Sequence, residues 1–289
     1  MDSKSPRASR FVLALLPALL ALPWSAANVH AAPLHAGGHH AYQTHAGERH
    51  ADEHLAGIDL SHAGLVASDF KSSVFSDANL MWADLTDAGL RNTDFSGASL
   101  VSALLVDANL RGASFDAADL SGAMMSGVRA KNARFTGAVL DGTDLDDAEL
   151  KNAHFFHASL VDALLSDSDL KNADFTGADL SGATLNDAEA RNARFDDALL
   201  DDADLRGSDV KNASFVGASV LGADLRELPN AGQADFTGAF YDDETLLDPE
   251  IDTSRMIYLP EPGSTAMLLT GVGALALGAR RRGVRWLEV

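Results

Sequence analysis

The ten residues from Lys171 to Leu180 read KNADFTGADL, and two closely similar decapeptides begin 40 residues before and after them. KNARFTGAVL starts at Lys131, and KNASFVGASV starts at Lys211. Within each copy the large apolar positions lie five residues apart. A period of five fits neither the 3.6-residue period of an α-helix nor the two-residue period of a flat strand. An internal repeat therefore decides the fold of this chain.

The five-residue period continues through most of the sequence. Apolar residues keep this register from Leu60 to Leu225, over 34 pentads, and a small residue, usually alanine, stands two positions before each of them. Ala130 and Ala190 are the smaller members, and we expect local looseness in the core beside them. A second period of 20 residues is marked by phenylalanine, which occupies Phe75, Phe95, Phe115, Phe135, Phe155, Phe175, Phe195 and Phe215. If four pentads make one square coil, these rings form a single internal column.

The pattern A-[DN]-L-x-x resembles the pentapeptide-repeat family. The resemblance implies an all-β solenoid, a right-handed, quadrilateral parallel β-helix with one pentad on each side. In that fold the central Leu or Phe and the preceding small residue point inward. The register predicts about 8 to 9 coils, and a spacing of roughly 4.8 Å between coils gives a length on the order of 40 Å. Neighbouring coils then supply the stability that no single coil has alone.

The positions expected to face solvent also repeat every 20 residues. One column is basic, and the next contains asparagine: Arg91, Arg111, Lys131, Lys151, Lys171, Arg191 and Lys211, followed by Asn92, Asn132, Asn152, Asn172, Asn192 and Asn212. Stacked Asn side chains can hydrogen-bond from coil to coil. An acidic column precedes the basic one, at Asp87, Asp107, Asp147, Asp167 and Asp187, and we expect it to pair with the basic column. Two interpretations of these columns are possible: a solvated surface of mutually neutralising charges, and a binding face.

The N-terminus has the three parts of a secretory signal peptide. Basic residues precede an apolar run from Phe11 to Trp24, and small residues offer a cleavage site at Val29-His30-Ala31. The alternative is a transmembrane anchor, but the apolar run is shorter than the roughly 20 residues that a spanning helix needs. We therefore assign residues 1–31 to a cleaved, helical signal segment.

The C-terminus carries a second targeting pattern. Pro260, Glu261 and Pro262 precede an apolar stretch, which ends at Arg280, Arg281 and Arg282. Residues 260–285 resemble the PEP-CTERM sorting signal. The resemblance implies a short helix in the inner membrane, cleavage by an exosortase-type protease, and release to the cell surface or the extracellular polymer. A plain membrane anchor with arginines on the cytoplasmic side is the alternative.

Between the targeting segments we expect three parts: a flexible His-rich segment (32–54), the solenoid (55–240) and a C-terminal cap or linker (241–259). Eight of the ten histidines lie between His30 and His62. Imidazoles at this density can bind Zn, Cu or Ni. The candidate ligands are His35, His39, His40, His45 and His50. A disordered spacer without metal is the competing interpretation.

Composition narrows the function. The chain has no cysteine and a net charge of −20; residues 1–31 carry +2 and residues 263–289 carry +3, so the part between them carries −25. Such acidity disfavours nucleic acid as a partner. The sequence contains no GxSxG, HExxH, P-loop or dinucleotide motif, so we expect neither an enzyme nor a cofactor.

The sequence therefore predicts an exported, non-enzymatic structural or interaction protein of the cell envelope or extracellular matrix. Expected partners are signal peptidase, an exosortase-type protease, and an extracellular polysaccharide or another envelope protein, with divalent cations as further ligands. Membrane contact is expected only through the sorting segments. Two alternatives are a DNA-mimicking inhibitor of a topoisomerase-like target and a metal-binding protein that uses the His-rich segment. An ice-binding solenoid is disfavoured, because Thr136 and Thr176 share a column with Asp116, Phe156 and Asp196.

Overall fold

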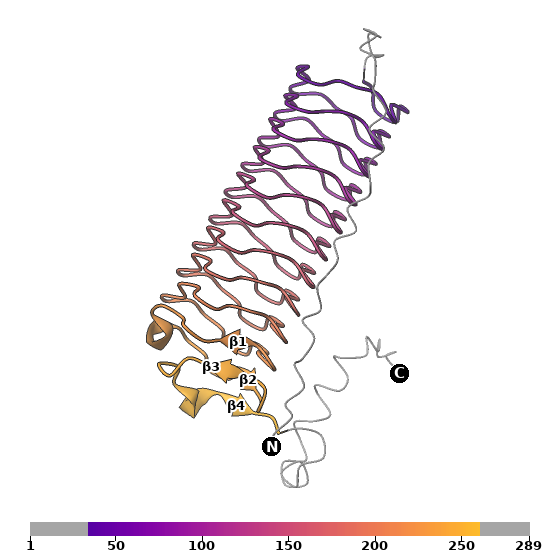
Figure 1. Ribbon diagram of the computed structural model, residues 1–289. Helices are drawn as coiled ribbons and strands as arrows, with labels where there is room; N and C mark the ends of the chain where they lie inside the picture. The colour runs from indigo at the N-terminus through magenta and orange to yellow at the C-terminus, as the bar shows by residue number, and fades with distance from the viewer. Residues whose placement is uncertain (1–33, 261–289) are drawn as a thin grey trace, which may run out of the picture. The chain divides into compact units, whose positions relative to one another are not determined.

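A computed structural model describes residues 34–260, which form one continuous parallel β-solenoid (Figure 1). The signal segment 1–31, most of the sorting signal, including Glu261, Pro262 and Arg280 to Arg282, and the helices expected there lie outside the described residues. Within the described part of the chain, no helix has the length and apolar character that crossing a bilayer requires.

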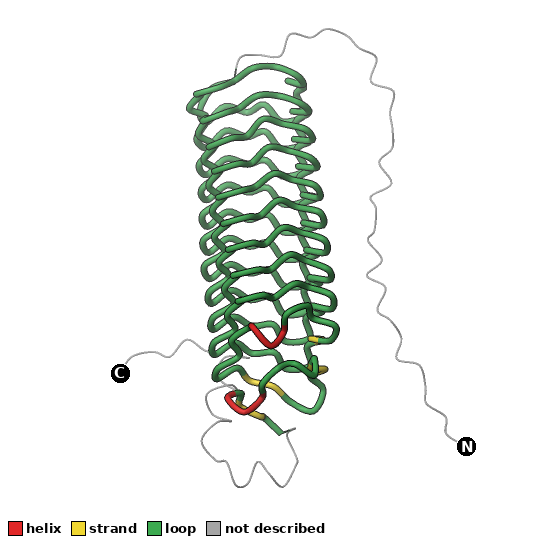
Figure 2. The backbone as a smooth tube through the Cα atoms, turned by 90° about the vertical axis from the view of Figure 1, so that its left-hand side faces the viewer, coloured by secondary structure: helices red, strands yellow, loops and turns green. Residues whose placement is uncertain are grey.

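Each coil of the solenoid spans 20 residues. Single-residue parallel bridges join each outer position to the equivalent position 20 residues later, beginning at His39↔Asp59 and Thr44↔Gly64. The bonds alternate in direction: Leu60 N donates to Asn79 O at 2.7 Å, and Asn79 N donates to Ile58 O at 2.8 Å. Because each side of a coil contributes only one bridge, the tube in Figure 2 shows almost no conventional strand.

A two-residue turn closes each side of the coil and explains the pentad spacing. In the turn after Phe175, for example, Ala178 N donates to Phe175 O at 2.9 Å. The second turn residue has a positive φ, such as 55° at Asn172 and 68° at Gly177. Asn, Asp and Gly tolerate this left-handed conformation best, which accounts for their frequency at this position.

The core is a stack of apolar layers. The residue at every fifth position and the small residue two before it are buried from Leu55 to Leu225. The Phe column from Phe75 to Phe215 is fully buried, with successive ring centroids 4.6 to 5.2 Å apart and nearly parallel planes. Phe236 extends the column at 4.5 Å, although it follows Phe215 by 21 residues. Such offset stacking adds to the free energy gained by burying the rings.

Ala130 and Ala190 belong to the same internal column as Leu110, Leu150 and Leu170, but the backbone ladders beside these two alanines differ. Beside Ala130 the ladder is intact, because Ala130 N donates to Glu149 O at 2.9 Å. On the same side the bridges continue through Asp169↔Glu189, but within the described residues no bridge joins Glu189 to Asp209. The smaller core residue thus coincides with an interrupted ladder at Ala190 and with a complete one at Ala130.

The solenoid begins before the boundary expected at residue 55. Bridges from His39, Thr44, Arg49 and His54 join residues 39–54 to the next coil. The structure therefore places these residues in an additional regular coil, where the sequence led us to expect a flexible segment. The pentad register continues here because His40, His45 and His50 take the inward position that Leu and Phe occupy elsewhere.

The C-terminal end departs from the 20-residue repeat. The elements are β1 (Asp224–Leu225), η1 (Ala231–Gln233), β2 (Phe240–Tyr241), β3 (Leu246–Leu247), η2 (Thr253–Arg255) and β4 (Ile257–Tyr258). β1 pairs in parallel with β3, and β2 pairs in parallel with β4. Figure 1 shows these pairs stacked beneath the last regular coil. They cover the end of the ladder, whose unpaired backbone groups would otherwise be open to pairing with other chains.

Candidate functional site

The first coil of the described chain has histidine at all four positions of the inward register, although His35, at the N-terminal edge, is exposed. His35, His40, His45 and His50, here called the imidazole layer, stand at the five-residue spacing that leads into Leu55. Their rings touch edge to face, with centroids 5.0, 6.3 and 5.5 Å apart in chain order. His40 and His45 are 2% and 1% exposed. A polar layer thus replaces the apolar one at this end of the solenoid.

The position two residues before each apolar residue is changed as well. Gln43, Glu48 and Glu53 replace the usual alanine, and each one contacts the ring three residues before it. The Nδ1 atoms of His40, His45 and His50 lie 3.1, 2.9 and 3.0 Å from the corresponding side-chain oxygens. The repeated His-x-x-(Gln/Glu) spacing therefore gives each of these three rings a side-chain hydrogen-bond partner three residues later.

Gly38 is the fourth residue at this position, and its lack of a side chain leaves room for two rings. A Cβ atom there would stand 2.7 Å from His40 Nε2 and 2.9 Å from His35 Nε2. Those two imidazoles approach each other, with His40 Nε2 3.4 Å from His35 Nδ1.

Glu48 lies between two imidazoles. Its Oε2 atom is 2.9 Å from His45 Nδ1 and 3.0 Å from His50 Nε2. The hydrogen bond from His45, helped by that from His50, holds the pKa of the Glu48 carboxyl below its usual value. One ligand atom from each of His45, Glu48 and His50 lies within 4.8 Å of the others, so the three form a compact donor group.

His50 joins the polar layer to the core. Both of its ring nitrogens face carboxylate oxygens, Nε2 toward Glu48 and Nδ1 toward Glu53, each at 3.0 Å. Its ring also stacks on Phe70, with the centroids 5.0 Å apart. The ring is therefore held from three sides, and its orientation is fixed.

One atom of the layer has no partner. His45 Nε2 is buried, and among the described residues nothing donates a hydrogen bond to it or accepts one from it. Leaving a buried polar atom unsatisfied costs about 1–3 kcal/mol. The layer is thus not completed by its own hydrogen bonds.

His39, the remaining candidate ligand from the sequence, points away from this layer. It lies on the outer face, its side chain is 87% exposed, and its Nδ1 is 3.4 Å from Asp59 Oδ2. Sequence reasoning missed Glu48 and Glu53. The signal available was their position, since both stand where the pentad pattern has alanine.

On the outer surface the asparagine column forms a continuous ladder. The amide nitrogens of Asn152, Asn172, Asn192 and Asn212 each donate to the side-chain oxygen of the Asn one coil earlier, at 2.9, 2.9, 3.1 and 3.3 Å. This chain of amides runs parallel to the internal Phe column.

The expected pairing between the Asp column and the basic column is wrong. Lys171 forms ion pairs with Asp169 and with Glu189, and Arg191 pairs with Asp209 at 2.7 Å. Among the residues from 34 to 260, no ion pair links Asp167 or Asp187 to these cations. The physical reason is that Asp167 and Lys171 belong to successive turns, at different corners of the coil. Asp169 stands two residues before Lys171, and Glu189 and Asp209 occupy the same position in the next coils. These acids therefore lie close to the cations.

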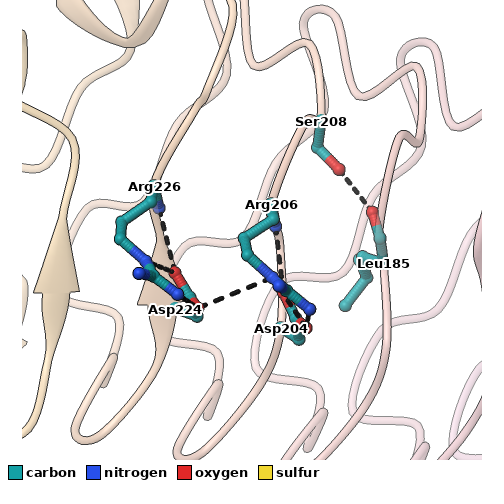
Figure 3. A network of polar contacts seen from close by, with 6 residues as sticks. All are labelled: Leu185, Asp204, Arg206, Ser208, Asp224 and Arg226. Carbon is teal, nitrogen blue, oxygen red and sulfur yellow. Dashed lines mark hydrogen bonds and ion pairs between the residues drawn. The ribbon is translucent and has the colours of Figure 1, made fainter.

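Near the C-terminal end the ion pairs join into a chain (Figure 3). Arg226 pairs with Asp224 at 2.6 Å, Arg206 lies 3.5 Å from the same carboxylate, and Arg206 also pairs with Asp204 at 2.5 Å. Inside the coil, Ser208 donates to Leu185 O, so the hydroxyl that replaces alanine there is satisfied. The chain of charges spans two coils and links the regular solenoid to β1.

The sequence of the chain also matches a family model. Residues 54–92, 93–129, 148–187, 158–197 and 193–227 match the family model described as pentapeptide repeats, with eight copies. These segments cover more than half of the chain. No curated protein matches the sequence.

Several solved structures are similar. HetL, a pentapeptide repeat protein involved in heterocyst differentiation regulation in the cyanobacterium Nostoc, is 28% identical over 68% of this chain and 89% of its own, with a TM-score of 0.31. A pentapeptide repeat protein from the thylakoid lumen of Arabidopsis thaliana is 32% identical over 38% and 67%, with a TM-score of 0.24. QnrB1, a plasmid-mediated fluoroquinolone resistance protein, is 19% identical over 79% and 97%, with a TM-score of 0.26.

Proposed function

Because this chain belongs to the pentapeptide-repeat family, we propose that it is an exported, non-enzymatic structural or interaction protein of the cell envelope or extracellular matrix. Its mechanism is architectural. The stacked Phe and Leu columns give stiffness, and the acidic faces give solubility and many weak, repeated contacts to a polymer or to another envelope protein.

One observation carries this proposal. The inward side chains are buried from Leu55 to Leu225, while the outer positions repeat with the same 20-residue period as the core. A solenoid of this kind presents the same polar group again and again at a fixed spacing, as the Asn ladder does. Such spacing suits multivalent contact with a polymer better than it suits a single concave site for a small molecule.

Sequence patterns support finer points of the same proposal: the pentad repeat supports the details of the coil, and the two terminal patterns support the steps of export. We infer that the coils wind in a right-handed sense with four sides and number about 8 to 9 over the 34 pentads from Leu60 to Leu225. Signal peptidase removes residues 1–31, and an exosortase-type protease removes the tail after transient anchoring in the inner membrane.

Intact-mass analysis of the native protein from fractionated cells tests the export step. A mature species that begins near Ala32 and ends near Pro262, found in the extracellular fraction, is the expected result. A full-length protein in the cytoplasm would remove the basis of the proposal. A supercoiling assay with DNA gyrase checks the DNA-mimic alternative, for which we expect no inhibition.

A further inference from the structure

We propose that His45, Glu48 and His50 form a binding site for a single divalent transition-metal ion, of which Zn²⁺ is the representative, at the N-terminal end of the solenoid. This site is independent of the export and matrix role. It also differs from the loose metal binding expected of a His-rich tail, because it uses a defined set of donors in a folded coil.

The distances between the three donor atoms suit a single ion. Glu48 Oε2 is 2.9 Å from His45 Nδ1 and 3.0 Å from His50 Nε2, and the three donors lie within 4.8 Å of one another. Zinc binds imidazole nitrogen and carboxylate oxygen at about 2.0–2.2 Å. Donors bound to one tetrahedral ion at those distances lie roughly 3.3 Å apart. The three groups therefore need only small side-chain movements to share an ion.

The side chain of His50 is held in place by residues behind it. His50 Nε2 faces the site, while its Nδ1 lies 3.0 Å from Glu53 Oε1. A carboxylate that accepts a hydrogen bond from the far nitrogen of an imidazole is the usual partner of a metal-bound histidine, because it fixes the tautomer and the ring orientation. The stacking of His50 on Phe70 restrains the same ring from the core side.

Burial and solvent access differ between the donors. His45 is 1% exposed, so its ring is held inside the first coil. At the same time the site is open on one side, since the Glu48 side chain is 46% exposed. An ion can therefore enter from solvent, and a water molecule can complete its coordination, as in other three-ligand zinc sites.

The test uses the full-length chain without a polyhistidine tag, stripped of metal by a chelator and titrated with Zn²⁺ in a calorimeter. We expect each chain to bind one equivalent of Zn²⁺ tightly. Glu48→Gln retains the shape of the side chain but removes the charged ligand, and His50→Gln removes an imidazole; each should weaken binding by at least about tenfold. Circular dichroism confirms that both variants keep the solenoid.

The matched control is the double variant His39→Gln/His54→Gln, which removes two outward-facing histidines from the same segment. It should bind Zn²⁺ as the parent does. The proposal is overturned if the parent takes up no Zn²⁺, or if the control loses as much affinity as Glu48→Gln. The second result would show that histidine number, and not this donor set, holds the ion.

A second measurement does not depend on variants. Co²⁺ in place of Zn²⁺ should give the intense visible absorption of a four- or five-coordinate site, and one equivalent of Zn²⁺ should abolish it. A weak spectrum, typical of six-coordinate Co²⁺ in water, would contradict the proposed site.

Discussion

At the scale of single residues, Asn172 meets two structural requirements, one through its side chain and one through its backbone. Its amide nitrogen donates to Asn152 and its oxygen accepts from Asn192, while its backbone adopts a φ of 55°. Glycine satisfies the backbone but not the ladder, and alanine satisfies neither. The two substitutions therefore separate the two contributions.

We expect Asn172→Gly to lower the free energy of unfolding by about 1 kcal/mol through the lost amide bonds. Asn172→Ala should lower it by about 2 kcal/mol, because a left-handed alanine costs roughly 1 kcal/mol more. Urea denaturation measures both. Asn92→Gly is the control and should cost less, since Gly112 follows Asn92 in the column. Equal losses for Asn92→Gly and Asn172→Gly would mean that the ladder contributes nothing.

Asp146 is a residue whose charge opposes folding. Burial raises the pKa of its carboxyl, and the neighbouring Asp144 and Asp147 raise it further, against the hydrogen bond donated by Ser166 N. A carboxyl with a raised pKa in the folded state destabilises the protein at pH values above that pKa. Protonation relieves this cost as the pH falls through it.

We therefore expect Asp146→Asn to raise the urea midpoint at neutral pH, because the amide oxygen can still accept from Ser166 N. The gain should shrink as the pH falls through the raised pKa toward 3.8, the ordinary pKa of an aspartic acid side chain. A gain that stays constant over this range would show that the charge is not its cause. Asp147→Asn, at the adjacent exposed turn, is the control and should change the midpoint less.

At the scale of the structural element, the Phe column is the continuous part of the core. Phe155 lies 4.7 Å from Phe135 and 4.6 Å from Phe175, centroid to centroid, with no exposed surface. Phe156 is the next residue, but it faces outward and is partly exposed. The same Phe→Ala substitution can therefore be made at an inward position and at the outward position next to it.

Phe155→Ala should cost about 3–5 kcal/mol, the usual range for a deleted core ring. Phe156→Ala should cost less than about 1 kcal/mol. Both values follow from urea denaturation monitored by far-ultraviolet circular dichroism. Similar costs for the two variants would contradict the assignment of inward and outward positions.

The internal columns could be predicted because a five-residue period separates inward from outward positions wherever the inward residue is Phe or Leu. The inward direction of His45 could not, since a period search looks for apolar residues and imidazole is polar. The signal was nevertheless present, because His35, His40, His45 and His50 keep the register of Leu55. Sequence spacing also misplaced the ion pairs, because neighbours along the chain at Asp167 and Lys171 lie at different corners, whereas Lys171 and Glu189 meet across coils.

At the scale of the whole molecule, the 20-residue coil is the unit that preserves every column. Deleting residues 136–155 removes one coil and brings Phe175 into stacking position on Phe135. Deleting residues 136–140 removes one pentad, so every later residue moves by one side of the coil. Phe155 then lies over Ala130, and no longer over Phe135.

We expect the coil deletion to fold cooperatively, with a denaturant slope lower than the parent's because less surface is buried. The pentad deletion should lose at least about 3 kcal/mol, the scale of one lost core ring, through the broken Phe column. Urea denaturation of the two deletions beside the parent makes the comparison. Equal stabilities would show that the columns do not matter.

The direction of the backbone bonds has a mechanical consequence. Bonds such as Leu60 N to Asn79 O, at 2.7 Å, run from coil to coil, so tension on the two ends loads them one coil at a time. Each coil that opens replaces about 4.8 Å of stack with about 70 Å of extended chain. In optical tweezers we expect repeated steps of about that length, and a single rupture of the whole solenoid would contradict it. Under load such a protein lengthens by yielding coil after coil, and it absorbs mechanical work without breaking its covalent chain.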